Sequence, residues 1–137
     1  MKLICVGKIK EKYLKEAIND YLKRLTKYIK LEVIELTKTE EIIKNIKDKD
    51  YVITLEIGGN QLDSLSFSKI IEKTLIENSN IVFIIGDSDG INKEVKERSN
   101  YKLSFSNMTY PHQLFRLIFL EQLYRSFKII NNETYHK

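Results

Sequence analysis

The sequence has one cysteine, one proline, two histidines and no tryptophan among its 137 residues. The single cysteine, Cys5, excludes a disulfide framework within the chain and any zinc site built from several cysteines. The two histidines, His112 and His136, stand too far apart in the sequence to indicate a metal site. No apolar run approaches the roughly 18–20 residues of a membrane span, and the N-terminal one is too short for a signal peptide. We therefore expect a cytoplasmic protein that uses neither a metal nor a membrane.

The length suits a single domain over residues 1–137, since one hydrophobic core serves chains of roughly 100–200 residues. The net charge is +4, and it is unevenly spread. Residues 1–50 carry 13 basic and 9 acidic side chains, residues 51–100 carry 5 and 8, and residues 101–137 carry 5 and 2. Basic ends attract polyanions such as nucleic acid, although an AT-rich genome also enriches lysine.

Short apolar runs alternate with amphipathic stretches along the whole chain. The apolar runs have the length and the β-branched content of strands. One of them, Ile81–Ile85, is apolar throughout, as in a parallel strand covered on both faces. Amphipathic spacing predicts helices at 12–28, at about 39–46, from Ser66 or Ser68 to 76, at 92–99 and from Pro111 onward. We predict strands at residues 3–6, 31–36, 51–57, 81–85 and 101–105.

Strands that alternate with helices predict an α/β fold in three layers, with a mostly parallel sheet of five or six strands. The last helix is apolar on most of its circumference between Leu114 and Phe127. A helix of this kind needs cover on most sides. We interpret the cover as a second subunit, which predicts a homodimer; the alternative is a central core helix in a monomer.

Three segments follow predicted strands, where open α/β sheets bind ligands: residues 55–59, 86–90 and 105–110. Gly86 and Gly90 allow a ligand to approach the backbone, or they only form a tight turn. The sequence lacks a phosphate-binding P-loop, a dinucleotide-binding glycine motif and a serine nucleophile motif, which argues against the corresponding enzyme classes.

The segments Thr109–Arg116 and Glu121–Arg125 decide the interpretation, together with the Ile85–Gly90 turn and the terminal Tyr135–Lys137. In combination they closely resemble the ribosomal RNA large subunit methyltransferase H family, of the SPOUT class of S-adenosylmethionine-dependent RNA methyltransferases. The resemblance covers nearly the whole chain. The segment between the second strand and the second helix is shorter here than in typical members, and Asp87 stands where the family commonly has a second glycine.

The resemblance implies a SPOUT-like fold with a C-terminal trefoil knot, a rare exception to unknotted chains, and it implies a homodimer. It also implies that S-adenosyl-L-methionine binds among the loops after the strands, read largely by backbone groups. Carried over by position, the cofactor-binding residues are Leu55, Gly86, Phe105, Ser106, Asn107, Met108, Thr109 and Tyr110.

The family's substrate is a pseudouridine of the large-subunit (23S) rRNA, methylated at N3 on the assembled ribosome. The resemblance makes His136 the leading candidate for the base that removes the N3 proton, since an imidazole titrates near neutrality. Arg116 is a candidate for holding a phosphate or the substrate base, with an intersubunit salt bridge as the alternative. Tyr135 is a candidate for stacking on the flipped target base, with filling of a surface groove as the alternative. A tail without an apolar period is otherwise expected to be poorly ordered.

Two function classes follow from these observations. The first is a dimeric rRNA methyltransferase. The second is a non-catalytic ribosome- or RNA-binding α/β module whose basic ends carry the function, and binding of S-adenosylmethionine distinguishes the two.

Overall fold

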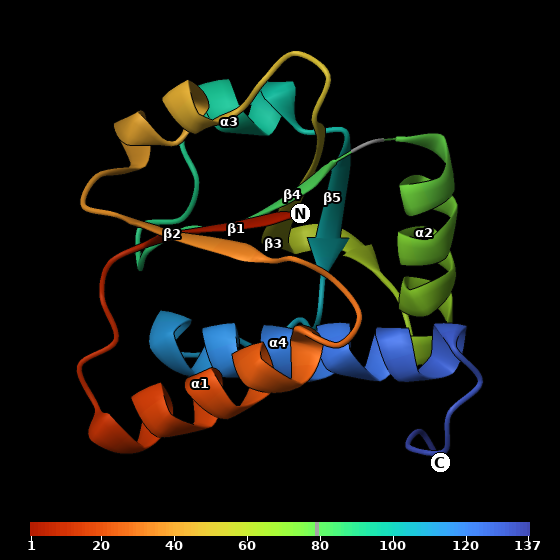
Figure 1. The fold of residues 1–137 in the computed structure, drawn as a ribbon. Helices are drawn as coiled ribbons and strands as arrows, with labels where there is room; N and C mark the ends of the chain where they lie inside the picture. The colour runs from red at the N-terminus through yellow and green to blue at the C-terminus, as the bar shows by residue number, and fades with distance from the viewer. Residues whose placement is uncertain (79) are drawn as a thin grey trace.

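A computed structural model describes residues 1–78 and 80–137. Within them, five strands form one sheet in the order β2-β1-β4-β3-β5, and each neighbouring pair is parallel (Figure 1). The strands are β1 (Lys2–Val6), β2 (Glu32–Leu36), β3 (Tyr51–Gln61), β4 (Ile81–Ile85) and β5 (Tyr101–Ser104). The predicted α/β class and the parallel sheet are confirmed.

Helices cover both faces of this sheet, which confirms the three layers. α1 (Lys12–Leu25), α2 (Ser64–Glu77) and α4 (His112–Ile130) pack on one face. The other face carries α3 (Lys93–Arg98) and two short 3-10 helices, η1 (Thr39–Glu41) and η2 (Ile43–Asn45). Figure 1 shows α1 and α4 below the sheet and α3 above it.

Strand β4 shows why an uninterrupted apolar run is needed at the centre of the sheet. All five of its residues are buried. Successive side chains of a strand point to opposite faces, and accordingly Phe83 and Ile85 join the core under α1 and α4, whereas Val82 and Ile84 join the core under α3. Each face therefore takes an apolar residue from every second position.

The structure corrects the predicted bounds of several elements. β3 does not end at Gly58; it continues to Gln61 with a shift of register, so that Leu55 and Asn60 both pair with Leu103. α2 begins at Ser64 rather than at Ser66 or Ser68, because the Asp63 carboxylate accepts a hydrogen bond from the Ser66 amide at 2.7 Å and caps the helix. α1 ends at Leu25, and the helix predicted at 39–46 is the pair of 3-10 turns.

The last helix finds part of its cover within its own chain. Phe119, Leu120 and Leu123 of α4 are fully buried, and α4 packs against both α1 and α2 beneath the sheet. Leu114, by contrast, is exposed, and Leu117 and Ile118 are half-buried, so part of the apolar circumference is not covered within the single chain. The buried side fits the alternative of a core helix, and the homodimer stays a prediction.

Candidate functional site

The ends of three adjacent strands meet at one edge of the sheet. Leu55 in β3 pairs with Ile85 in β4 on one side and with Leu103 in β5 on the other. Because all the strands are parallel, the segments that leave them emerge together. The register thus brings Leu55, Gly86 and the start of segment 105–110 to the same place.

Gly86 lies in a turn with no room for a side chain. A Cβ at this position would lie 2.4 Å from the carbonyl oxygen of Gly90. Gly90 has φ +86° and donates its amide hydrogen bond to the Asp87 carbonyl at 2.9 Å, which closes the turn. The Asp87 carboxylate accepts a hydrogen bond from the Asp89 amide at 2.9 Å. Asp87 therefore stabilises the turn itself.

Segment 105–110 is anchored at its two ends and open between them. The Phe105 ring packs edge-on against Phe67 and Phe115, and Tyr110 stacks on Phe115. Ser106 Oγ accepts a hydrogen bond from the Met108 amide at 2.9 Å. Met108 is 74% exposed. The aromatic anchors hold the segment in place and leave Met108 and its neighbours free to meet a ligand.

Asn107 of this segment has a hydrogen-bond partner on β3, and Thr109 is exposed. Asn107 Oδ1 accepts a hydrogen bond from Gln61 Nε2 at 2.7 Å, which joins the segment to the far end of β3. This contact of Gln61 could not be predicted from the sequence, because the part of β3 that carries Gln61 follows a glycine pair typical of turns.

His112 packs beside the loop that follows β1. Gly7 has φ +96°, and a Cβ there would stand 3.6 Å from His112 Nε2. The neighbouring Gln113 Oε1 accepts the Lys10 amide at 3.0 Å. The first turn of α4 thus packs against the β1–α1 loop, the packing role that a histidine in this turn commonly has.

Arg116 is buried, with 3% of its surface exposed. Its guanidinium forms an ion pair with Glu35 of β2 and donates a hydrogen bond from Nη2 to the Gly7 carbonyl at 3.0 Å. Both partners belong to the same chain, and the contacts predicted with a phosphate, the substrate base or a partner subunit stay predictions. A guanidinium that enters a core needs such partners, because its charge has left water.

The C-terminal tail is docked rather than poorly ordered in the single chain. The Tyr135 ring packs edge-on against Tyr124, with centroids 5.1 Å apart, and its hydroxyl donates a hydrogen bond to Glu121 Oε1 at 3.3 Å. The pKa of Tyr135 is raised to about 12, and burial of the side chain is the main cause. Arg125 lies over the Tyr135 ring and is 3.1 Å from His136 Nδ1. The expectation that nothing would dock this tail overlooked the aromatic partner on α4.

Not all of the predicted site residues come together. Among the described residues, no hydrogen bond or aromatic contact joins Tyr135 or His136 to segment 105–110. Gln61 at the end of β3 contacts Asn107 of the segment, whereas Tyr135 and His136 contact Glu121 and Arg125 of α4. Glu121, which holds both Arg125 and Tyr135, was missed as a functional residue, although its four-residue spacing from Arg125 is a recognisable ion-pair signal.

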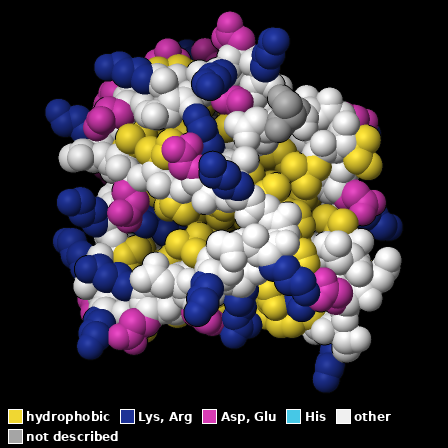
Figure 2. Space-filling model, viewed as in Figure 1, with side chains coloured by type: hydrophobic (Ala, Val, Ile, Leu, Met, Phe, Trp, Pro, Cys, Tyr) yellow, Lys and Arg dark blue, Asp and Glu magenta, His cyan; other side chains and the backbone are white. Residues whose placement is uncertain are grey.

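Two hollows of about 540 and 420 Å³ lie along the β2 edge, between α1 and β2, and not at the ends of β3, β4 and β5. Figure 2 shows apolar surface at the centre of the face turned to the viewer, with lysine, arginine and acidic side chains around it. Across residues 1–78 and 80–137, no three His, Cys, Asp or Glu side chains are grouped to hold a metal ion. No helix in these ranges is long and apolar enough to cross a membrane.

Comparison with known proteins identifies the family. A family model described as "Predicted SPOUT methyltransferase" matches residues 1–136. The ribosomal RNA large subunit methyltransferase H of Clostridium tetani is 48% identical over 155 residues, covering 98% of both chains. That of Clostridium botulinum (strain Langeland) is 49% identical over 157 residues, covering 100% of this chain and 99% of the relative. The chain belongs to the ribosomal RNA large subunit methyltransferase H family, in the SPOUT class.

Solved structures of more distant SPOUT-like proteins share the fold. A methylase family protein from Haemophilus influenzae superposes with a TM-score of 0.63 at 12% identity, covering 99% of this chain and 70% of that one. The SpoU methyltransferase AviRb from Streptomyces viridochromogenes, solved in complex with AdoMet, gives a TM-score of 0.58 at 8% identity, covering 97% of this chain and 58% of that one. The alignments with methyltransferase H relatives run over 155 to 157 positions, so this 137-residue chain is shorter than they are.

Proposed function

We propose that the chain is an rRNA methyltransferase that uses S-adenosyl-L-methionine. The observation that carries this proposal is the match of the SPOUT family model to residues 1–136. It is supported by relatives named ribosomal RNA large subunit methyltransferase H that align over at least 98% of both chains. The matched range, residues 1–136, includes the segments in which the candidate site residues lie.

The strand-end site fits the proposed cofactor. Gly86 is buried at the end of β4, and its lack of a side chain lets the Gly90 carbonyl pack against it, which gives the loop that would hold the cofactor its shape. Met108, in segment 105–110, and Ile57, two residues after Leu55, expose 74% and 54% of their surfaces, and such side chains would offer apolar contacts to an adenosine ring. Leu55, Gly86 and residues 105–110 would hold the cofactor, largely through backbone groups that match the edge of adenine. When bound there, S-adenosylmethionine supplies a methyl group on a positively charged sulfur.

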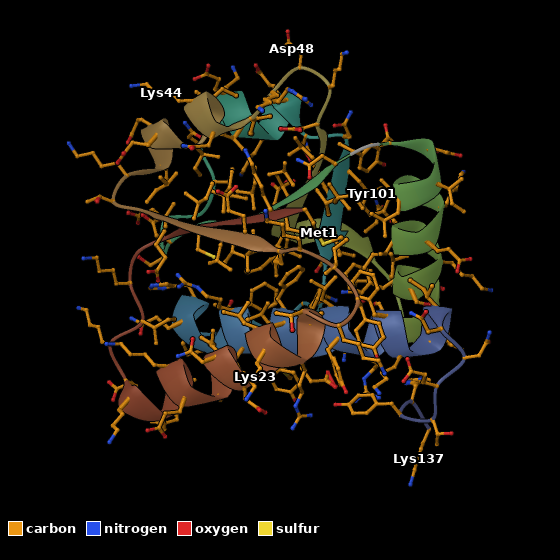
Figure 3. The ribbon with its side chains drawn as sticks, viewed as in Figure 1. Met1, Lys23, Lys44, Asp48, Tyr101 and Lys137 are labelled. Atoms are coloured by element: carbon orange, nitrogen blue, oxygen red, sulfur yellow. The ribbon has the colours of Figure 1, made fainter. Side chains whose placement is uncertain are left out.

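The proposed substrate is N3 of a pseudouridine in the large-subunit rRNA of the assembled ribosome, which places the protein in the cytoplasm. A homodimer and a trefoil knot belong to the same proposal. The net charge of +4 supports an RNA partner, because lysine and arginine side chains contact phosphates without reading sequence. Lys137, at the end of the tail in Figure 3, is one side chain available for such a contact.

The chain contributes positioning and electrostatics to the reaction. In this proposal Tyr135 and His136 meet the target base from the tail docked on α4. Arg116 acts at a distance: by holding Gly7 and Glu35 to α4, it fixes the start of the helix that follows segment 105–110. Accurate placement of two reactants is worth several orders of magnitude in rate.

Calorimetric titration with S-adenosylmethionine, and with its demethylated product, tests the cofactor site. We expect saturable heat from the wild type. Gly86→Ala should bind about tenfold more weakly or worse, because its new methyl group would collide with the Gly90 carbonyl. Gly58→Ala is the matched change, since a Cβ there meets no atom within 4 Å. Equal losses in the two variants would contradict the placement of the site at Gly86.

Transfer of a labelled methyl group to ribosomes that lack the modification tests the activity itself. The label should appear in large-subunit rRNA at one pseudouridine. If neither cofactor nor product gives saturable heat and no label is transferred, the non-catalytic RNA-binding module is the correct interpretation.

A further inference from the structure

Two residues of the docked tail, Tyr135 and His136, form one connected polar cluster with Glu121 and Arg125 of α4. Arg125 donates hydrogen bonds to Glu121 Oε1 from Nε at 3.0 Å and from Nη2 at 2.5 Å. The remaining Nη1 is 3.1 Å from Nδ1 of His136. Glu121 also accepts the Tyr135 hydroxyl, and the Arg125 guanidinium lies 4.8 Å from the centroid of the Tyr135 ring. The guanidinium is thereby fixed on three sides.

This contact determines where the proton of His136 sits. A guanidinium has five N–H donors and no acceptor, so Nδ1 has to accept the hydrogen bond from Arg125. A neutral imidazole that accepts at Nδ1 carries its proton on Nε2. In the docked tail Nε2 is therefore a donor, and the lone pair of Nδ1 is engaged by Arg125.

We propose that Arg125, held by Glu121, is a positioning residue that fixes His136 as an Nε2–H donor, so that His136 donates a hydrogen bond to a carbonyl oxygen of the target base instead of removing its proton. The inference rests on the proposed function for the identity of that base. In this proposal His136 is a hydrogen-bond donor, and not the base that the sequence analysis suggested.

The chemistry of a uracil ring suits such a donor. N3 lies between two carbonyl groups, and when its proton leaves to water the negative charge spreads onto their oxygens. The nitrogen electron pair then forms the bond to the methyl carbon, and the electron pair of the carbon–sulfur bond returns to sulfur, which becomes neutral. A donor aimed at one carbonyl oxygen stabilises the anion on which this displacement depends.

The surroundings of the ring fit this arrangement. The Arg125 guanidinium occupies the Nδ1 side of the ring, so only Nε2 is left to meet a substrate. Asp63, which caps the start of α2, has its carboxylate engaged by the Ser66 amide. His136 itself is exposed, so Nε2 is free to meet RNA.

Nitrogen NMR of the free protein labelled at histidine tests the tautomer. The chain has two histidines, so His136→Gln assigns the signals. We expect Nδ1 of His136 to be unprotonated and Nε2 to carry the proton, and Arg125→Ala to give a mixture of tautomers. Lys128→Gln, one turn further along α4, removes a different anchor of the tail and should keep the single tautomer. A proton on Nδ1 in the wild type, or identical spectra for wild type and Arg125→Ala, would overturn the proposal.

Single-turnover methyl transfer tests the role of the donor. Gln carries an N–H group near the position of Nε2 but is no base, so His136→Gln should retain a rate within about tenfold of wild type, whereas His136→Ala should lose about 10²–10³-fold, as for a lost oxyanion donor. Equal, severe loss in both variants would show that His136 is a base and refute the proposal. If the wild type transfers no methyl group, the proposed function fails, and the NMR result still decides the tautomer.

Discussion

The guanidinium of Arg116 in the first half of α4 is hydrogen-bonded to the carbonyl oxygen of Gly7 at the end of β1, with 3.0 Å between Nη2 and the oxygen. The same guanidinium pairs with Glu35 on the neighbouring strand β2. Three elements distant in sequence therefore meet at one buried positive charge. The loop after β1 and the start of α4, which carries His112, are fixed relative to each other by this contact.

Replacing Arg116 with Met should lower the free energy of unfolding, because Arg116 has a structural role. The substitution leaves the Gly7 carbonyl without a partner and Glu35 without its counter-charge, at a cost of about 1–3 kcal/mol. Glu35 is 39% exposed and can turn to water, which places the expected loss toward the lower end. Urea unfolding measures the difference. Glu35→Gln, which keeps an acceptor, should lose less; a variant of unchanged stability would contradict the structural role.

Cys5 should be unreactive in the folded protein. Its side chain is 1% exposed in the centre of β1. Burial raises the pKa of the thiol to about 12, so almost no thiolate exists near neutrality. A disulfide reagent that reports released thiolate should give no signal within minutes in buffer and one equivalent in denaturant. Rapid reaction without denaturant would show that β1 opens locally.

The order of strands and helices could be predicted from the sequence because each element carries its own periodic signal. The five apolar residues of β4 are an example, since a strand covered on both faces is apolar at every position and is recognised as one continuous run. The ends of strands were also identifiable at Gly86, where a side chain has no room. Local patterns therefore determine these features.

The features that were not predicted depend on contacts between distant segments. The extension of β3 past Gly58 is stabilised by pairing with β5, some forty residues later, and overrides the turn preference of a glycine pair. The docking of Tyr135 depends on Tyr124 and Glu121, which a tail without periodicity does not indicate. Cover for α4 by α1 and α2 likewise appears only once the layers are assembled.

Two leucines of α4 should separate core packing from association between subunits. Leu123 is fully buried in its own chain, so Leu123→Ala should cost about 2–5 kcal/mol of folding stability whatever the oligomeric state. Leu114 is 36% exposed on the same helix, so Leu114→Glu should leave the fold intact. If the proposed homodimer uses this face, sedimentation of Leu114→Glu should show monomer. A stable dimer in that variant would place the interface elsewhere.

The anchor of the tail at Glu133 should give it a pH dependence of its own. Tyr28 Oη donates a hydrogen bond to Glu133 Oε1 at 2.8 Å, and Lys128 and Lys27 lie 3.1 and 3.4 Å from Oε2. The hydrogen bonds from Tyr28 and Lys128 hold the pKa of Glu133 below its ordinary value of 4.5. Because the pKa is lowered in the docked state, this contribution is complete above about pH 4.5 and is lost as the pH falls through the lowered pKa. The NMR signals of the Tyr135 ring should shift toward those of a free tail in that window, while the signals of the sheet remain unchanged. Glu133→Gln should abolish the transition, and a tail that stays docked until the whole protein unfolds in acid would show that the aromatic contacts of Tyr135 suffice.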